Sequence, residues 1–318
     1  MSIATRVLWP VWNADERRPR ALVRLAIYVA LVALVMLVSG LTASLFGRGL
    51  GAMSVYFGVH ALGVLVVTTL CARAIDRRPI ASIGLAPRRG YLLDLGFGVV
   101  LGAVCMGAIA LLELSLGWAR FAPRVLDGVA IGSSLTVFVS VALVEELAFR
   151  GYALPNLREM LPASVPPDRA VTVAVVLSSL AFGVAHGANP HASAIATAYV
   201  AFGGVFLAIG LVVQGDLAIP IGAHLGWNFF QNFFGMQVSG QTWLEDAAVL
   251  HRVELGPDVA TGGAFGPEAG LEGLAAMVLG IVLTLGWLRL RGVPLRVHPS
   301  LAHTTLVTSA GRRGRIAQ

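Results

Sequence analysis

Charged residues are scarce in this chain of 318 residues. Asp, Glu, Lys and Arg together make up only 13% of it, whereas 57% of its residues are hydrophobic; a soluble domain has about 25% charged and about 45–50% apolar residues. The mean hydropathy of +0.79 also excludes an intrinsically disordered chain, because disordered segments are poor in apolar residues. The composition therefore indicates a membrane protein.

Cysteine is almost absent as well. The two cysteines, Cys71 and Cys105, both lie within apolar runs. This number excludes a small disulfide-linked scaffold, and neither residue has a histidine at the spacing of a zinc knuckle. We expect both thiols to be free and to pack as small hydrophobic side chains.

Lysine is missing altogether, so all 23 basic residues are arginines, and the net charge is +6. A basic chain can bind nucleic acid, but these arginines lie beside the apolar runs instead of along one amphipathic face. That distribution is typical of residues that orient membrane spans. The sequence therefore predicts contact with a lipid bilayer and no binding of nucleic acid.

Apolar runs recur along the chain, and about 20 such residues can cross the hydrocarbon core of a bilayer as a helix. We expect an all-α fold, a polytopic bundle of about eight transmembrane helices. The fifth and seventh runs are short or polar. The predicted spans are Leu25–Phe46, Val55–Ile75, Leu92–Trp118, Val129–Phe149, Val171–Ala185, Ala194–Val213, Leu217–Phe234 and Leu271–Leu290.

The predicted organisation has three parts. Residues 1–24 form a cytoplasmic N-terminal segment, residues 25–291 a transmembrane helical domain, and residues 292–318 an Arg-rich cytoplasmic tail. The loop 235–270 is acidic and external in this scheme. With both termini in the cytoplasm of a multi-pass protein of the cell membrane, few arginines fall outside, as the positive-inside rule requires; these are Arg48, Arg120, Arg124 and Arg252.

Ionisable side chains near the centre of a span cost about 2.5–3.5 kcal/mol each, so they need a structural or chemical reason. Glu145, Glu146 and Arg150 stand together at the end of the fourth predicted span. Glu146 reaches Arg150 at i,i+4, which leaves the other carboxylate free. The pair of acids could simply mark the membrane boundary; alternatively, Glu145 is a general base kept dry by Phe149.

Two further polar groups stand on later spans. His186 follows Phe182 at i+4 on the fifth run, and Asn228 follows His224 at i+4 on the seventh. Residues four apart share one face of a helix. Taken alone, His186 fits an interfacial residue, and the His224–Asn228 pair fits interhelical hydrogen bonding.

The three groups together favour hydrolysis, because each presents a side chain that can move a proton, bind a metal or stabilise an oxyanion. Other hydrolytic designs are excluded by inspection. The chain contains no His-Glu-x-x-His zinc helix and no Gly-x-Ser-x-Gly nucleophile motif.

The residues resemble the CAAX prenyl endopeptidase and bacteriocin-processing (CPBP, or Abi) family of intramembrane proteases. Its pattern is Glu-Glu-x-x-x-Arg, Phe-x-x-x-His and His-x-x-x-Asn on successive helices, and all three parts occur here in order. Arg78–Leu85 is similar to the usual lead-in, so the resemblance covers residues 78–232. The matching positions are Glu145, Glu146, Arg150, Phe182, His186, His224 and Asn228.

The resemblance implies roles for these residues. Glu145 would activate water, His186 would assist or bind the same water, and His224 with Asn228 would stabilise the oxyanion. Glu146 and Arg150 would support Glu145 as a charge pair at the helix end, with Phe182 beside them. The implied substrate is a membrane-anchored or lipid-modified polypeptide.

The resemblance leaves the cofactor open between none and zinc, because the family is classed with the metalloproteases. His186 and His224 would be zinc ligands in the second scheme. Asn228 is a poor zinc ligand, which favours the metal-free scheme. Two other functions also stay open: a non-proteolytic immunity or regulatory protein of the same fold, and a proton-coupled transporter, which the lack of an inverted repeat disfavours.

Overall fold

The computed structural model describes residues 11–85, 88–125, 127–307 and 313–315. Residues 1–10 of the predicted N-terminal segment therefore lie outside the described residues. So do residues 308–312 and 316–318 of the predicted Arg-rich tail.

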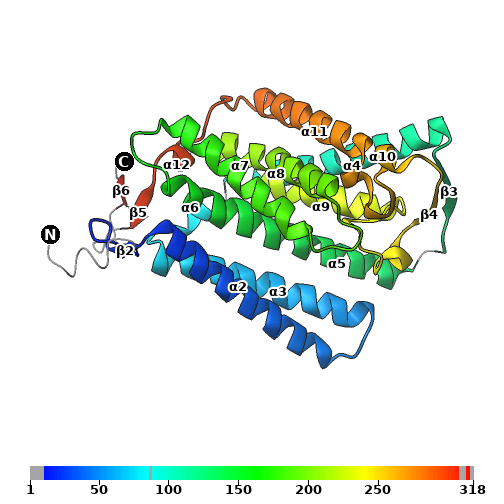
Figure 1. Cartoon of the computed structure of the whole chain (residues 1–318), viewed down its shortest axis with the longest axis horizontal. Coiled ribbons are helices and arrows are strands. Elements are labelled where there is room, and N and C mark those ends of the chain that lie inside the picture. Colours follow the sequence, from blue (N-terminus) through cyan, green and yellow to red (C-terminus); the bar gives the residue numbers. More distant parts are fainter. Residues whose placement is uncertain (1–10, 86–87, 126, 308–312, 316–318) are drawn as a thin grey trace.

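The described chain is a bundle of long helices (Figure 1). The bundle helices are α2 (Ala21–Ser44), α3 (Leu50–Leu70), α4 (Tyr91–Leu116), α5 (Gly128–Glu145), α6 (Leu154–Glu159), α7 (Pro167–His186), α8 (Ala194–Gln214), α9 (Ala218–Phe233) and α11 (Leu271–Leu290). The short helical elements are the π-helices η1 (Cys71–Ile75) and η3 (Glu146–Ala153), the 3₁₀ turns η2 (Ile80–Ile83), η4 (Glu245–Ala247), η5 (Gly263–Phe265) and η6 (Pro267–Ala269), and α10 (Asp258–Thr261) and α12 (Pro299–Ala302).

In the described part of the chain, three two-stranded antiparallel sheets lie at the ends of the bundle. Their strands are β1 (Trp12–Asn13) with β2 (Arg18–Pro19), β3 (Ala119–Pro123) with β4 (Leu250–Glu254), and β5 (Thr305–Val307) with β6 (Arg313–Arg315). In the sheet of β3 and β4, Ala119 lies opposite Glu254. Figure 1 places β2 and α12 at one end of the bundle and β3 with β4 at the other, so the two ends of the described chain lie on the same side.

The predicted all-α membrane bundle is confirmed. Within the described ranges, seven helical stretches are long and apolar enough to cross a membrane, and the last runs over Leu271–Leu290 as expected. The seventh predicted span is present as α9, but its 16 residues make a helix of only about 24 Å. It is buried among α4, α5 and α8, so protein and not lipid surrounds it.

The fourth predicted span does not end at Phe149. The helical path continues from α5 through η3 into α6, so one apolar stretch runs over Gly128–Glu159. The polar groups at Glu145 and Arg150 therefore lie well inside this stretch and not at its boundary. The reason is that Arg150 is neutralised within the bundle and does not need to reach water.

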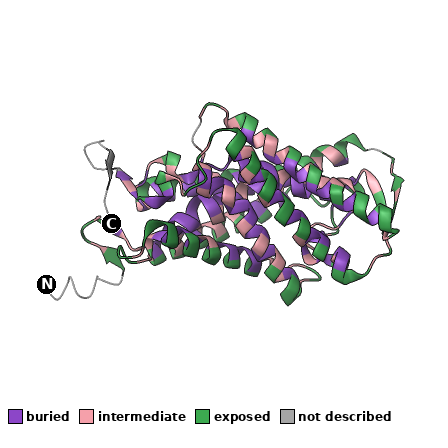
Figure 2. Cartoon of the chain, turned by 90° about the horizontal axis from the view of Figure 1, so that it is seen from above, coloured by how far each residue is buried: buried purple, intermediate pink, exposed green. Residues whose placement is uncertain are grey.

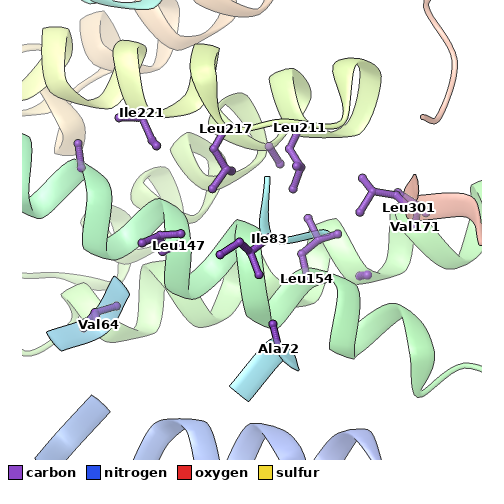
Figure 3. Packing of buried hydrophobic residues seen from close by; sticks show 13 residues of the cluster. Val64, Ala72, Ile83, Leu147, Leu154, Val171, Leu211, Leu217, Ile221 and Leu301 are labelled. Carbon is purple, nitrogen blue, oxygen red and sulfur yellow. The ribbon is translucent and has the colours of Figure 1, made fainter. Parts of the chain in front are cut away.

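Burial is concentrated where the central helices meet, and the outer faces are exposed (Figure 2). On α2, for example, Leu34, Leu37 and Leu41 are all more than half exposed, as expected of side chains that face lipid tails. Inside, one apolar cluster packs around η3 and α6 (Figure 3). Leu147 and Leu154 are fully buried there, which fixes the helical segment that follows Glu145.

Glycines bring α9 against α4 with almost no space between the backbones. A Cβ atom at Gly102 would lie 2.2 Å from the backbone nitrogen of Trp227, and one at Gly226 would lie 2.3 Å from the carbonyl oxygen of Val99. Small residues permit this approach between membrane helices. The contact sets the position of α9, the helix that carries His224 and Asn228.

Candidate active site

The first part of the site lies where α5 passes into the π-helix η3. Asp127 begins α5 as its N-cap by accepting hydrogen bonds from the backbone of Val129 and Ala130. After the 18 residues of α5 the helix widens to π geometry at Glu146. Such segments are frequent at functional sites, because the wider turn redirects the side chains around it.

Glu145 faces two histidines from other helices. Its Oε2 atom lies 3.8 Å from Nε2 of His186 on α7 and 3.7 Å from Nε2 of His224 on α9. Both distances are too long for hydrogen bonds. Among the described residues this buried oxygen has no hydrogen-bond partner, so the three atoms surround a point that a small molecule such as water can occupy.

Glu146 faces away from that point and into the protein. Its Oε1 accepts from Nη1 of Arg150 at 3.0 Å and from Nδ1 of His224 at 2.9 Å. Arg150 also donates to the carbonyl oxygen of Gly204 at 3.1 Å and lies over the ring of Phe182, 4.4 Å from its centroid. Glu146 and Arg150 are fully buried. The expected charge pair is therefore present, but it contacts His224 directly and is not at a helix end.

His186 is held at the end of α7. Its Nδ1 lies 2.8 Å from the carbonyl oxygen of Phe182, and because a carbonyl only accepts, Nδ1 carries the proton and Nε2 is left facing Glu145. The Phe182 ring lies 4.6 Å from the imidazole and packs edge-on against Phe149. Both phenylalanines belong to the wall that encloses the acid.

Asn228 lies one turn beyond His224 on α9, and its side chain is buried. Asn228, His224, His186 and Glu145 line one cavity of about 400 Å³, a size within the usual range of about 300–1,000 Å³ for small-molecule sites. The structure thus brings together the four residues that the sequence predicts as catalytic. Their roles stay predictions.

The loop 235–270 forms part of the same cavity, which the sequence did not predict. Ser239 and Trp243 from residues 235–270 line it together with apolar side chains of α5 and α8. Asn189 donates to the carbonyl oxygen of Ser239 at 3.0 Å, and Ser239 has a positive φ of 49°. The loop is therefore folded against the site.

Glu268 is a second acid that the sequence analysis did not assign to the site. It lines the cavity and accepts hydrogen bonds from Nε2 of Gln231 at 3.0 Å and from the backbone nitrogen of Ser239 at 2.9 Å. Burial raises the pKa of the Glu268 carboxyl, although these two hydrogen bonds and the nearby His186 lower it. Glu268 belongs to a loop with several acidic residues, so the sequence did not indicate that its side chain faces the cavity.

His60 of α3 also lines this cavity and was missed. The sequence could have indicated it, because His60 is an ionisable residue in the middle of the second predicted span. An ionisable side chain at that depth is costly and needs a structural or chemical reason.

Zinc would require histidine nitrogens and a carboxylate oxygen at about 2.0–2.2 Å from one point. The side chains of His186 and His224 have the right chemistry. However, the described part of the chain has no group of three or more His, Cys, Asp or Glu residues arranged to hold a metal ion. The arrangement of these side chains therefore does not fit a preformed zinc site.

Comparison with known families agrees with the resemblance seen in the sequence. Residues 127–230 match the family described as type II CAAX prenyl endopeptidase Rce1-like, and this range contains all seven motif positions. None of the curated proteins and none of the solved structures that were compared matches the chain. The predicted resemblance to the CPBP (CAAX protease) family is thus confirmed over residues 127–230, in a protein with several membrane spans.

Proposed function

From the CAAX-protease segment and the cavity that it forms, we propose that this protein is an intramembrane endopeptidase that hydrolyses a peptide bond in a membrane-anchored polypeptide. The observation that carries the proposal is the convergence of Glu145 Oε2 with the Nε2 atoms of His186 and His224 at 3.8 and 3.7 Å. A general base with a second polar group at this spacing can hold one water molecule between them.

In the proposed first step, that water donates one hydrogen bond to Glu145 and one to the unprotonated Nε2 of His186. Glu145 takes a proton as the water oxygen forms a bond to the carbonyl carbon. The carbonyl oxygen becomes an oxyanion. His224 and Asn228 lie on the next helix along the cavity wall and donate to this oxygen.

His224 suits that role because only one of its ring nitrogens is engaged by a carboxylate at hydrogen-bond distance. Glu146 lies 2.9 Å from Nδ1 and accepts its proton, whereas Nε2 lies 3.7 Å from Glu145, so a proton on Nε2 is free to be donated to the oxyanion. Such preorganised donors stabilise an oxyanion by about 2.7–4 kcal/mol each in a site that excludes water. Arg150 supports Glu146 in this position.

In the second step, the carbon–nitrogen bond breaks and its electron pair goes to the nitrogen. The departing amine then needs one proton, and the new carboxyl group leaves the site as an acid. No metal takes part in this scheme.

The substrate is a membrane-anchored or lipid-modified polypeptide. Much of the cavity wall is apolar, and it extends to Met36 on the peripheral helix α2 and to Tyr56 on α3. A hydrophobic segment that arrives laterally from the bilayer would find apolar contacts along this path.

We also propose that the protein resides in the cell membrane with both termini in the cytoplasm. The distribution of arginines favours this orientation. The cavity, which is lined in part by the loop 235–270, would then be reached from the external half of the bilayer.

Cleavage by the purified full-length protein tests the proposal. In liposomes, a library of synthetic peptides with one apolar span each is incubated with the protein, and products are identified by mass spectrometry. We expect cleavage by the wild type and none by Glu145→Gln, which keeps the shape of the side chain but removes the base. Absence of cleavage by the wild type would favour a non-proteolytic protein of this fold, and proton flux in the same liposomes would favour a transporter.

A further inference from the structure

The mechanism requires a proton for the departing amine, and the three motifs of the matched segment give no separate residue for it. His60 offers one from outside that segment. His60 lies in the middle of α3 and is only 7% exposed. An ionisable side chain at this depth needs a reason.

The surroundings of His60 do not give it a structural partner. Its Nδ1 atom is buried and has no hydrogen-bond partner within the described part of the chain. A buried polar atom without a partner costs about 1–3 kcal/mol. Tyr56, one turn earlier, stacks on the imidazole, with its ring nearly parallel at a centroid distance of 5.8 Å.

His60 faces the reaction site. It lines the same cavity as Glu145, His186 and His224. The other titratable side chains that line the cavity are Tyr56, one turn earlier on α3, and Glu268, in the loop 235–270. Met36 is the cavity-lining residue of α2, which packs against α3, and it carries no charge.

The helix α3 lies on the side of the site where the departing amine is expected. The oxyanion donors come from α9, and α5 packs against both α3 and α9, which places α5 between these two helices (Figure 1). With the carbonyl oxygen toward α9, the nitrogen of the scissile bond points away from it, toward α3.

We propose that His60 is a further catalytic residue, which protonates the nitrogen of the departing amine. As the carbon–nitrogen bond breaks, the imidazolium of His60 gives one proton to the nitrogen, which takes the electron pair of the bond. The proton that Glu145 removed from water then returns to His60. One water and one peptide bond become one carboxylic acid and one amine. This role rests on the proposed endopeptidase function.

A comparison of two scissile bonds tests this role. An amide needs a proton on its leaving nitrogen, whereas a thioester leaves as a thiolate without one. The probe is the best-cleaved span peptide of the library described above, prepared with the amide and with a thioester at the scissile position. In His60→Gln we expect kcat for the amide to fall by about 10²-fold, the lower end for loss of a general acid, and kcat for the thioester to stay unchanged.

Two further variants separate chemistry from packing. His60→Ala leaves space for a free imidazole, so added imidazole should restore part of the amide cleavage. Ser54→Ala removes another unpartnered polar atom of α3 and should change neither reaction. Thermal unfolding in detergent shows whether each variant is folded.

The outcomes distinguish this proposal from the proposed function. If the wild type cleaves neither bond, both are overturned. If the wild type is active and His60→Gln loses amide and thioester cleavage equally, or loses neither, the endopeptidase function stands and the assignment of His60 as the proton donor is wrong.

Discussion

The imidazole of His224 shares the carboxylate of Glu146 with the guanidinium of Arg150, its Nδ1 lying 2.9 Å from Glu146 Oε1. The first acid of the motif faces the cavity and the second faces the protein interior. Because a carboxylate accepts the Nδ1 proton, the other ring nitrogen of His224 is directed at Glu145. Glu145 and Glu146, which are adjacent in the chain, thus face the two different ring nitrogens of His224.

A first prediction concerns the stability that this arrangement provides. Glu146→Gln leaves Arg150 fully buried without its charged partner, and removal of one member of a buried ion pair costs about 3–5 kcal/mol. We expect a clearly lower free energy of unfolding in detergent. Glu145→Gln is the matched control, because Glu145 has no cationic partner in salt-bridge contact other than the two histidines among the described residues, and it should unfold like the wild type.

The double variant Glu146→Gln/Arg150→Met tests the cause. Methionine removes the uncompensated charge while keeping an unbranched side chain, so stability should recover relative to Glu146→Gln alone. A double variant less stable than the single one would contradict the ion-pair explanation.

A second prediction concerns the oxyanion. Asn228→Ala should lower kcat by about 10²–10³-fold, as expected for the loss of one donor, with little change in thermal unfolding. Asn232→Ala removes the same amide one turn further along α9, where it donates to the carbonyl oxygen of Leu244 at 2.9 Å. Its effect should appear in stability and not in kcat.

Metal analysis completes this test. We expect the metal content of Asn228→Ala to equal that of the wild type and chelators to have little effect on cleavage. Stoichiometric zinc that disappears in His186→Ala and His224→Ala, with inactivation by chelator and recovery on adding zinc, would show that the water is activated by a metal.

A third prediction concerns pH. Burial raises the pKa of Glu268 above its usual 4.5 in the folded protein. The folded state therefore binds this proton more tightly than the unfolded state, so the stability from Glu268 is fully present below about pH 4.5 and is lost as pH rises through the raised pKa. Glu268→Gln should be less sensitive to pH than the wild type between pH 4.5 and neutrality, as measured by thermal unfolding. Identical pH profiles would contradict the raised pKa.

A fourth prediction concerns orientation. A reporter fused after Gln318 should behave as cytoplasmic and one inserted at Gly262 as external, because the arginines cluster at the end of the bundle that holds the termini. Labelling of single cysteines at the two positions in intact cells provides an independent measurement. The reverse pattern would place the cavity on the cytoplasmic side of the membrane.

Local pattern accounts for what the sequence could predict. The i,i+4 spacing of Phe182 with His186 and of His224 with Asn228 places each pair on one helix face, and a long apolar run gives the bounds of α11 to the residue. The ion pair of Glu146 and Arg150 follows from the same spacing. These features depend on neighbours within one helix turn.

Features that depend on contacts between distant segments could not be predicted. The hydrogen bond between Glu146 and His224 joins residues 78 positions apart, so no pattern within either helix indicates it. The continuation of the helix through η3 depends on the hydrogen bond that Arg150 donates to the carbonyl oxygen of Gly204, 54 positions away on α8. Glu268 turns inward because Gln231 and Ser239 supply donors, and these belong to other parts of the chain.

The shortness of α9 has a consequence for how the protein tolerates different membranes. Helices that face lipid adjust to bilayer thickness by tilting, and the exposed faces of α2 place it in this group. The helix α9 is only about 24 Å long and is surrounded almost entirely by other helices. Its length therefore does not have to match the thickness of the bilayer. Its register is set by backbone contact with α4 at Gly102 and Gly226. The peripheral helices can therefore follow the composition of the membrane while the distance between Glu145 and His224 is kept by the interior of the bundle.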